Sequence, residues 1–239
     1  MNSGEIRMSL VVPTYNEGEN VEAMVRQLSG ALEPLFQERY EIIIVDDDSP
    51  DRTWELAETI AKTNPRLKVI RRTGERGLAT AVVAGWRAAR GEILGVIDGD
   101  LQHPPEVLGK LAAAMEEGTD IAIASRHVEG GGISKWSMAR RMVSRTAQAI
   151  GLMLLPGAAS RVSDPMSGYF LLRRNLIEPV TLQPVGYKIL LEVLARAKPV
   201  KIREVGYVFR EREKGGSKAN FGVFLQYLQH LWRLRFGGK

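Results

Sequence analysis

Residues 93–105 read ILGVIDGDLQHPP, an apolar run that ends directly in two aspartates. The run predicts a buried strand over residues 93–98, followed by a polar turn. Pro104 and Pro105 favour the start of a helix over residues 105–117, because proline fits the first turn of a helix. This stretch therefore predicts a strand–turn–helix unit of an α/β fold.

The same alternation continues on both sides of this stretch. Near-continuous apolar runs, typical of strands covered on both faces, predict strands at residues 9–13, 41–46, 67–71 and 120–125. Amphipathic segments predict helices at residues 19–32, 53–63 and 79–89. Strands alternating with helices indicate a mostly parallel, Rossmann-like sheet with helices on both faces, in one domain over residues 1–239.

The pattern after residue 126 is less regular. It predicts a loop at 129–132, a long helix at 137–155, a strand at 168–173, a helix at 187–197, a strand at 201–209 and a C-terminal helix at 221–236. The helix at 137–155 is basic in its first half and apolar in its second, so it is either an interfacial helix or an ordinary core helix.

Composition excludes several classes of protein. The chain has 239 residues, 44% of them hydrophobic and 26% charged, which argues against wholesale disorder. The absence of cysteine excludes disulfides and thiolate chemistry, and three scattered histidines make a histidine-ligated metal site improbable. No apolar run approaches the ~20 residues of a spanning helix, and the N-terminus does not resemble a signal peptide, so we expect a cytoplasmic protein.

The net charge of +5 is unevenly distributed. From residue 196 onward eleven Lys and Arg face three Glu, which leaves −3 on the preceding residues. A basic tail predicts a polyanionic partner, such as nucleic acid, anionic lipid or a phosphorylated substrate. The alternative interpretation is that these charges only form a solvated surface. The tail lacks the interleaved aromatic residues of a nucleic-acid platform, which argues against nucleic acid.

The acidic end of the 93–98 strand is the clearest chemical signal. In an extended chain Asp98, Asp100 and Gln102 would project three oxygen groups to one side, at the strand end where α/β sheets bind ligands. Such oxygen ligands suit Mg²⁺ or Mn²⁺, especially when substrate phosphates complete the coordination shell. The alternative is an acidic turn that caps the next helix, but Gly99 permits close backbone approach and favours the metal.

Two earlier strand ends carry further polar groups. In IVDDDSPD, residues 44–51, an acid can accept hydrogen bonds from a ribose or base, while Ser49 and Asp51 suit a helix cap, and both can hold. In VVPTYNE, residues 11–17, Tyr15 offers a ring for stacking and Glu17 an acceptor, although packing alone would also explain Tyr15. Neither GxGxxG nor GxxxxGK[ST] follows a strand, which argues against dinucleotide and P-loop folds.

These motifs occur in one order with DPMSGYF at residues 164–170 and GGSK at residues 215–218. From about residue 10 to the last helix the chain resembles the inverting GT-A glycosyltransferases of family 2, most closely the dolichol-phosphate (polyprenol-phosphate) mannose synthases. Related synthases that use UDP-glucose share the early motifs, but the DPMSGYF run is more similar to the mannose branch. The resemblance implies a GT-A fold, with a nucleotide-sugar half at about 1–126 and an acceptor half at about 127–239.

The resemblance also assigns roles to residues. It implies that the guanosine of GDP-mannose is held by Pro13, Tyr15, Glu17, Val45 and Asp47. It implies that the metal, Mg²⁺ or Mn²⁺, is held by Asp98, Asp100 and Gln102, and that these residues with Gly99 contact the ribose and diphosphate. The phosphates of donor or acceptor would meet Arg126, Arg140, Lys188, Arg212 and Lys218. Of these, Asp98, Asp100 and Arg126 would act in catalysis.

The implied acceptor is a polyprenyl (dolichyl) phosphate, which places the protein peripherally on an anionic membrane surface at the cytosolic face. Many relatives carry transmembrane helices beyond the point where this sequence ends, so the expectation is either a membrane-anchoring partner subunit or an absent segment of the same chain. The alternative of another class is a non-catalytic nucleotide-sugar-binding module that docks on membranes.

Overall fold

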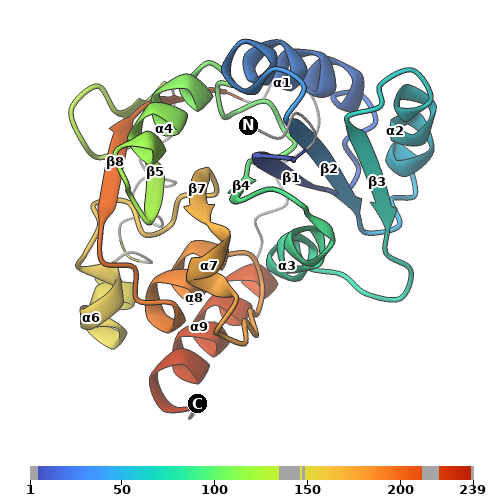
Figure 1. Ribbon diagram of the computed structural model, residues 1–239. Helices are drawn as coiled ribbons and strands as arrows, with labels where there is room; N and C mark the ends of the chain where they lie inside the picture. Colours follow the sequence, from blue (N-terminus) through green and yellow to red (C-terminus); the bar gives the residue numbers. More distant parts are fainter. Residues whose placement is uncertain (1–4, 135–145, 147–148, 212–220, 238–239) are drawn as a thin grey trace.

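The computed structural model describes residues 5–134, 146, 149–211 and 221–237 and shows one central sheet between two layers of helices (Figure 1). The seven strands are ordered β3-β2-β1-β4-β7-β5-β8. Their bounds are β1 Met8–Thr14, β2 Tyr40–Asp46, β3 Leu67–Arg71, β4 Ile93–Val96, β5 Ile121–Ser125, β7 Phe170–Arg173 and β8 Ile202–Gly206. Every neighbouring pair is parallel except those of β7, which runs antiparallel to β4 and β5. The mostly parallel sheet is thus confirmed.

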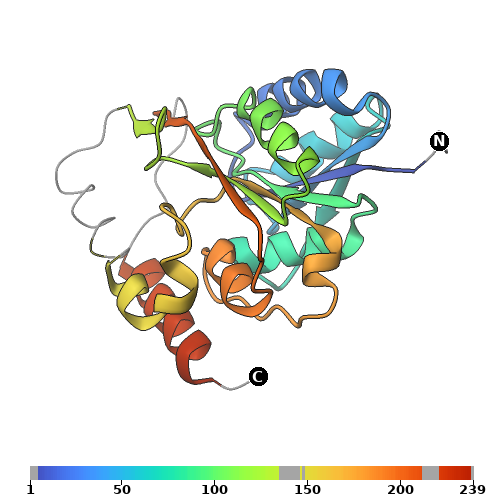
Figure 2. The same cartoon turned by 60° about the vertical axis from the view of Figure 1, so that its left-hand side comes forward.

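Helices cover both faces of the sheet (Figures 1 and 2). One face packs against α1 Val21–Phe36, α2 Thr53–Ala61 and α4 Val107–Glu116. The other packs against α3 Leu78–Ala88, α6 Pro156–Ala159, α7 Arg174–Ile177, α8 Ile189–Arg196 and α9 Phe221–Phe236. Successive strand residues serve opposite cores, since Leu10 and Val12 lie in the first and Val11 in the second.

The strand order reverses beside β1. The chain runs outward from β1 through β2 to β3, and then returns to place β4 on the other side of β1. Open α/β sheets bind ligands at such a reversal, outside the carboxyl ends of the strands. Helix α3 packs closely on this part of the sheet, because a Cβ at Gly85 would lie 2.5 Å from Val11. The Gly77 amide, at the start of α3, donates to Asp47 at the end of β2, so the N-terminus of α3 lies at the reversal.

Two elements differ from the sequence prediction. The strand expected at 201–209 is divided into β8 and β9, and β9 (Val208–Phe209) pairs with β6 (Gly132–Ile133) in a separate small sheet. The division occurs at Gly206, where a Cβ would lie 2.0 Å from the Glu129 carbonyl oxygen, so the 129–131 turn crosses the chain there. Helix α1 continues through Pro34 to Phe36, because Leu32 and Phe36 both bury in the core.

The other predicted elements agree closely with the structure and α9 has the predicted bounds, whereas the short elements α6, α7 and β6 were not predicted. Residues 149–154 of the helix expected at 137–155 are helical, and residues 135–145 and 147–148 lie outside the described residues. Within the described part of the chain, no helix is both long and apolar enough to span a membrane. The proposed boundary near residue 126 stays a prediction.

Candidate active site

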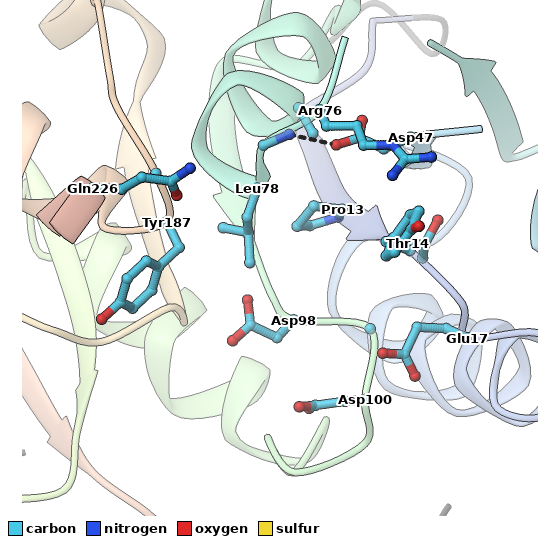
Figure 3. A pocket seen from close by; sticks show the side chains of 15 residues that line it. Pro13, Thr14, Glu17, Asp47, Arg76, Leu78, Asp98, Asp100, Tyr187 and Gln226 are labelled. Atoms are coloured by element: carbon cyan, nitrogen blue, oxygen red, sulfur yellow. Dashed lines mark hydrogen bonds between the residues drawn. The ribbon is translucent and has the colours of Figure 1, made fainter. Parts of the chain in front are cut away.

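A pocket of about 400 Å³ opens at the carboxyl ends of β1, β2 and β4, where the strand order reverses (Figure 3). Strand ends line it together with the start of α3, and the Gly186–Tyr187 turn and α9 contribute Tyr187 and Gln226 on the opposite side. The lining residues with charged or polar side chains are Thr14, Tyr15, Glu17, Asp47, Arg76, Asp98, Asp100, Tyr187 and Gln226.

The acidic triplet after β2 divides into separate structural roles. Asp46 fixes the strand end, since its carboxylate accepts hydrogen bonds from Thr14 Oγ1 at 2.8 Å and Ser49 Oγ at 2.6 Å. The N-cap of α2 is Arg52, without a side-chain capping bond, and Asp51 accepts from the amide and hydroxyl of Thr53 at 3.0 and 2.6 Å. Ser49 bonds to Asp46 and not to the helix, and Asp47 is the carboxylate of this segment that lines the pocket.

Asp47 joins the end of β2 to the start of α3. Its side chain is 7% exposed and lies 2.5 Å from Arg72 Nη2, while its Oδ2 accepts from the Gly77 amide at 2.7 Å. Burial raises the pKa of Asp47, although Gly77 and Arg72 act in the opposite direction. Arg72 also donates to the Gly77 carbonyl at 3.0 Å. This network holds the 72–77 loop against the pocket.

The end of the pocket near β1 combines a ring, a cation and a carboxylate. The Arg76 guanidinium lies 4.9 Å from the centre of the Tyr15 ring. Glu17 is buried and accepts from Asn20 Nδ2 at 2.7 Å at the start of α1. A ring beside a fixed acceptor suits a planar base. Pro13 also lines this end, whereas the Val45 side chain is fully buried in the core and lines no part of the pocket.

The segment after β4 brings two of its three predicted ligands to the pocket. Asp98 and Asp100 line it, with Gly99 between them. The chain turns here rather than staying extended, and Leu101 adopts a φ of 59°. Gln102 is not among the residues that line the pocket, and its amide nitrogen donates to the Arg210 carbonyl at 2.9 Å. The metal-binding role of these residues stays a prediction.

The residues present fit a hard divalent cation. Among the residues that the structure describes, no group of three or more His, Cys, Asp or Glu could hold a metal ion by itself. Two carboxylates from one turn leave several coordination positions to phosphate oxygens and water, as is usual for Mg²⁺. A site of this kind depends on its ligand for completion.

A buried ion pair lies beside this turn. Arg126 Nε and Nη2 contact the two oxygens of Asp164, each at 2.7 Å, and the Arg126 amide donates to the same carboxylate at 3.1 Å. Burial alone would raise the pKa of Asp164, but the hydrogen bonds and charge of Arg126 lower it. Arg126 keeps its charge, since Asp164 and Asp98 raise its pKa against the effect of burial.

Lys188 forms a second cation near Asp98. Its Nζ donates to the Met166 carbonyl at 2.9 Å. Burial, together with repulsion from Arg126, lowers the pKa of Lys188 to about 8, and Asp98 and Asp164 partly oppose that shift. Arg126 and Lys188 are not among the residues that line the pocket, but the charge of Asp98 acts on both of them. The predicted residues Arg140, Arg212 and Lys218 lie outside the described residues.

Several residues of the site were missed by the sequence analysis. Arg72 and Arg76 belong to RRTGERG, a basic, glycine-containing loop after β3 that signals an anion-binding turn. Asp164 stands in the DPMSGYF run, which carried the family resemblance without a role for its acid. Gln226 has no sequence signal, because only tertiary packing brings α9 to the pocket.

Comparison with known proteins places this geometry in context. A family model described as glycosyl transferase family 2 matches residues 9–181. A dolichol-phosphate mannosyltransferase of Pyrococcus furiosus is 45% identical over 96% of this chain, and the chain spans 64% of that relative. A Saccharomyces cerevisiae protein of the same name is 37% identical, with 96% of this chain and 87% of the relative covered.

A solved structure shares the fold. Glucosyl-3-phosphoglycerate synthase from Mycobacterium tuberculosis, in complex with Mn²⁺, uridine diphosphate and glucosyl-3-phosphoglycerate, superposes with a TM-score of 0.71 at 19% identity. The match covers 98% of this chain and 81% of the other. The expected GT-A architecture is confirmed by this likeness and by the sheet order.

Proposed function

Because the chain belongs to glycosyl transferase family 2, we propose that it transfers mannose from GDP-mannose to a polyprenyl (dolichyl) monophosphate and releases GDP. The observation that carries the proposal is the pocket itself. Groups suited to a base and a two-carboxylate turn line it, and two cations, Arg126 and Lys188, are close enough to feel the charge of Asp98. The names of two curated relatives support mannose and the lipid phosphate.

The donor would lie along the strand ends. Guanine would stack near Tyr15 and Arg76, and Glu17 and Asp47 would accept from its edge or from the ribose. The diphosphate would then reach Asp98 and Asp100, where Mg²⁺ or Mn²⁺ would neutralise the negative charge that develops on departing GDP. The sugar would face the opposite wall, from which Tyr187 and Gln226 project in Figure 3.

The charge of the acceptor phosphate suits the two cations near Asp98, Arg126 and Lys188. A phosphate monoester has a second pKa of about 6, so the acceptor oxygen is already ionised near neutrality and needs no general base. Arg126 and Lys188 would offset the repulsion between this anion and the donor diphosphate. A single in-line displacement at the sugar carbon would invert its configuration.

Helix α9 supports docking on an anionic membrane. Trp232 and Phe236 are 62% and 56% exposed, and their rings lie 4.3 Å apart beside Arg233 and Arg235 in the last turn. Exposed aromatic and basic residues together favour the membrane interface. The buried His230–Glu192 contact, 2.8 Å long, holds α9 on α8. We place the protein peripherally at the cytosolic face, with a membrane-anchoring subunit as a further partner.

Transfer of labelled mannose tests the proposal. Wild-type protein is mixed with GDP-mannose and a polyprenyl phosphate in vesicles, with Mn²⁺ or with chelator, and labelled lipid is extracted. We expect mannosyl lipid with Mn²⁺, and almost none from Asp100→Asn, whose binding to the vesicles should be unchanged. Failure of the wild-type protein to form product with Mn²⁺ would contradict the proposal.

Nucleotide binding tests the choice of donor. We expect GDP with Mn²⁺ to raise the melting temperature more than UDP does, because the donor is proposed to be GDP-mannose. A response to UDP alone would favour the glucosyl alternative. If wild-type protein bound GDP and vesicles but transferred no sugar, a docking module would replace the enzyme.

A further inference from the structure

We propose that His103 is a positioning residue that fixes the orientation of the Asp98 carboxylate in the donor site. The proposal goes beyond the function proposed above, which gives His103 no role, and it rests on Asp98 facing a donor and its metal. His103 Nε2 lies 3.3 Å from Asp98 Oδ2.

The His103 ring is held in place by three aromatic side chains. His103 is 3% exposed and lies in a cage of Tyr169, Tyr207 and Phe209, with ring centres 5.1–5.4 Å away. The Tyr207 ring is stacked on the imidazole at an interplanar angle of 28°, and the other two rings meet it edge-on. A ring enclosed in this way has little freedom to turn away from Asp98.

The position of the proton follows from the surroundings. Nδ1 of His103 is buried and has no hydrogen-bond partner among the described residues. An imidazole N–H belongs where an acceptor is available. We therefore assign the proton to Nε2, from which it is donated to Asp98 Oδ2.

Gly168 restricts the same carboxylate from another direction. A Cβ at this position would lie 2.8 Å from Asp98 Oδ2 and 3.0 Å from Oδ1, so the glycine main chain lies directly against the carboxylate. His103 and Gly168 therefore both lie against the Asp98 carboxylate. Carboxylates that bind metal ions are commonly oriented by hydrogen bonds of this kind.

The turn that carries His103 is itself anchored. The Gln102 side chain donates to the Arg210 carbonyl, and the Arg210 amide donates back to the Gln102 carbonyl, both at 2.9 Å. Arg210 directly follows β9, which supplies the Phe209 ring of the cage. The cage therefore fixes the metal-binding turn to the small β6–β9 sheet.

Matched variants separate the hydrogen bond from packing. His103→Leu fills the cage without a donor, and His103→Gln places an amide N–H near the position of Nε2. Tyr207→Phe removes a hydroxyl that has no hydrogen-bond partner in the described part of the chain and serves as the packing control. Mn²⁺ binding to each GDP-saturated protein is measured by electron paramagnetic resonance, and folding by thermal unfolding.

We expect His103→Leu to weaken Mn²⁺ binding about 10- to 100-fold, the usual effect of removing a group that orients a metal ligand. His103→Gln should recover most of that affinity, Tyr207→Phe should bind like wild type, and GDP binding in chelator should be unchanged in all three. In transfer assays the Leu variant should lose kcat while its KM for polyprenyl phosphate stays constant.

Two results would overturn the proposal. The first is a folded His103→Leu protein that binds Mn²⁺ as tightly as wild type, and the second is a His103→Gln protein as weak as the Leu variant. Wild-type protein that binds Mn²⁺ and GDP but transfers no mannose would refute the proposed function and leave the role of His103 intact.

Discussion

Replacement of Asp164 by asparagine tests how much the buried Arg126–Asp164 ion pair contributes to the stability of the protein. Asp164 is 1% exposed, and the Arg126 side chain 9% exposed, so the change leaves a guanidinium buried without its counter-charge. The asparagine retains the shape of the side chain, so the lost interaction is electrostatic and not steric. The asparagine amide keeps one acceptor oxygen, so one of the two 2.7 Å hydrogen bonds is lost and the other no longer has a charged acceptor.

The expected effect is large. Removing one partner of a buried ion pair costs about 3–5 kcal/mol of unfolding free energy. For a chain of this length each kcal/mol lowers the melting temperature by about 2–4 °C, so Asp164→Asn should melt about 6–20 °C below wild type. Substituting both residues, as Arg126→Met with Asp164→Leu, should restore most of the stability, because well-packed apolar side chains often replace a buried pair without loss.

The sign of the pH dependence follows from the lowered pKa of Asp164. Its folded pKa lies below the ordinary value of 3.8, so the stabilisation is complete at neutral pH and is lost as pH falls through the folded pKa. The melting difference between wild type and Asp164→Asn should therefore be constant from pH 7 to about 5 and should shrink below about pH 4.

Calorimetry across this pH range measures the stability of each variant, and the mannose-transfer assay measures its activity. We expect the double variant to be stable but inactive, since it lacks the cation that would meet the acceptor phosphate. A difference below about 1 kcal/mol for Asp164→Asn at pH 7, the value typical of an exposed pair, would refute the reasoning. Full activity in the stable double variant would refute the assigned role of Arg126.

Three further predictions concern other parts of the site. Lys188 has a pKa of about 8, so it loses its charge above pH 8, and the KM of wild type for polyprenyl phosphate should then rise. In Lys188→Arg the KM should stay flat, because arginine remains charged; equal pH profiles would contradict the prediction. Gly168→Ala should displace Asp98 and abolish Mn²⁺ binding while GDP binding in chelator persists, both measurable by calorimetry; unchanged Mn²⁺ affinity would contradict the close approach. Trp232→Ser should weaken sedimentation with anionic vesicles, whereas Leu56→Ser, an exposed apolar residue on α2, should not; equal losses would indicate a nonspecific effect.

The order of strands and helices was predictable because it depends on local periodicity. Apolar runs such as 42–45 and the glycines that end helices are visible in the sequence alone. The division between β8 and β9 was not predictable, since it depends on contact between Gly206 and the Glu129 turn, far away in the chain. For the same reason Pro34 did not end α1, where burial of Phe36 outweighs the local effect of proline.

In the candidate site, too, the features that depend on contacts between distant segments could not be predicted from the sequence. The sequence placed Asp98 and Asp100 at a strand end, and the structure brings both to the pocket. The direction of Gln102 depended on a left-handed residue at Leu101 and on a partner in the distant 210 segment. His103 looked like an isolated histidine because its cage is formed by rings that lie 66 or more positions away.

Crystals grown with GDP and Mn²⁺ give the most direct test of the donor site. We predict an anomalous manganese peak in contact with Asp98, Asp100 and the diphosphate, with guanine beside Tyr15. GDP bound in another cavity, or bound in this pocket with manganese remote from both carboxylates, would contradict it.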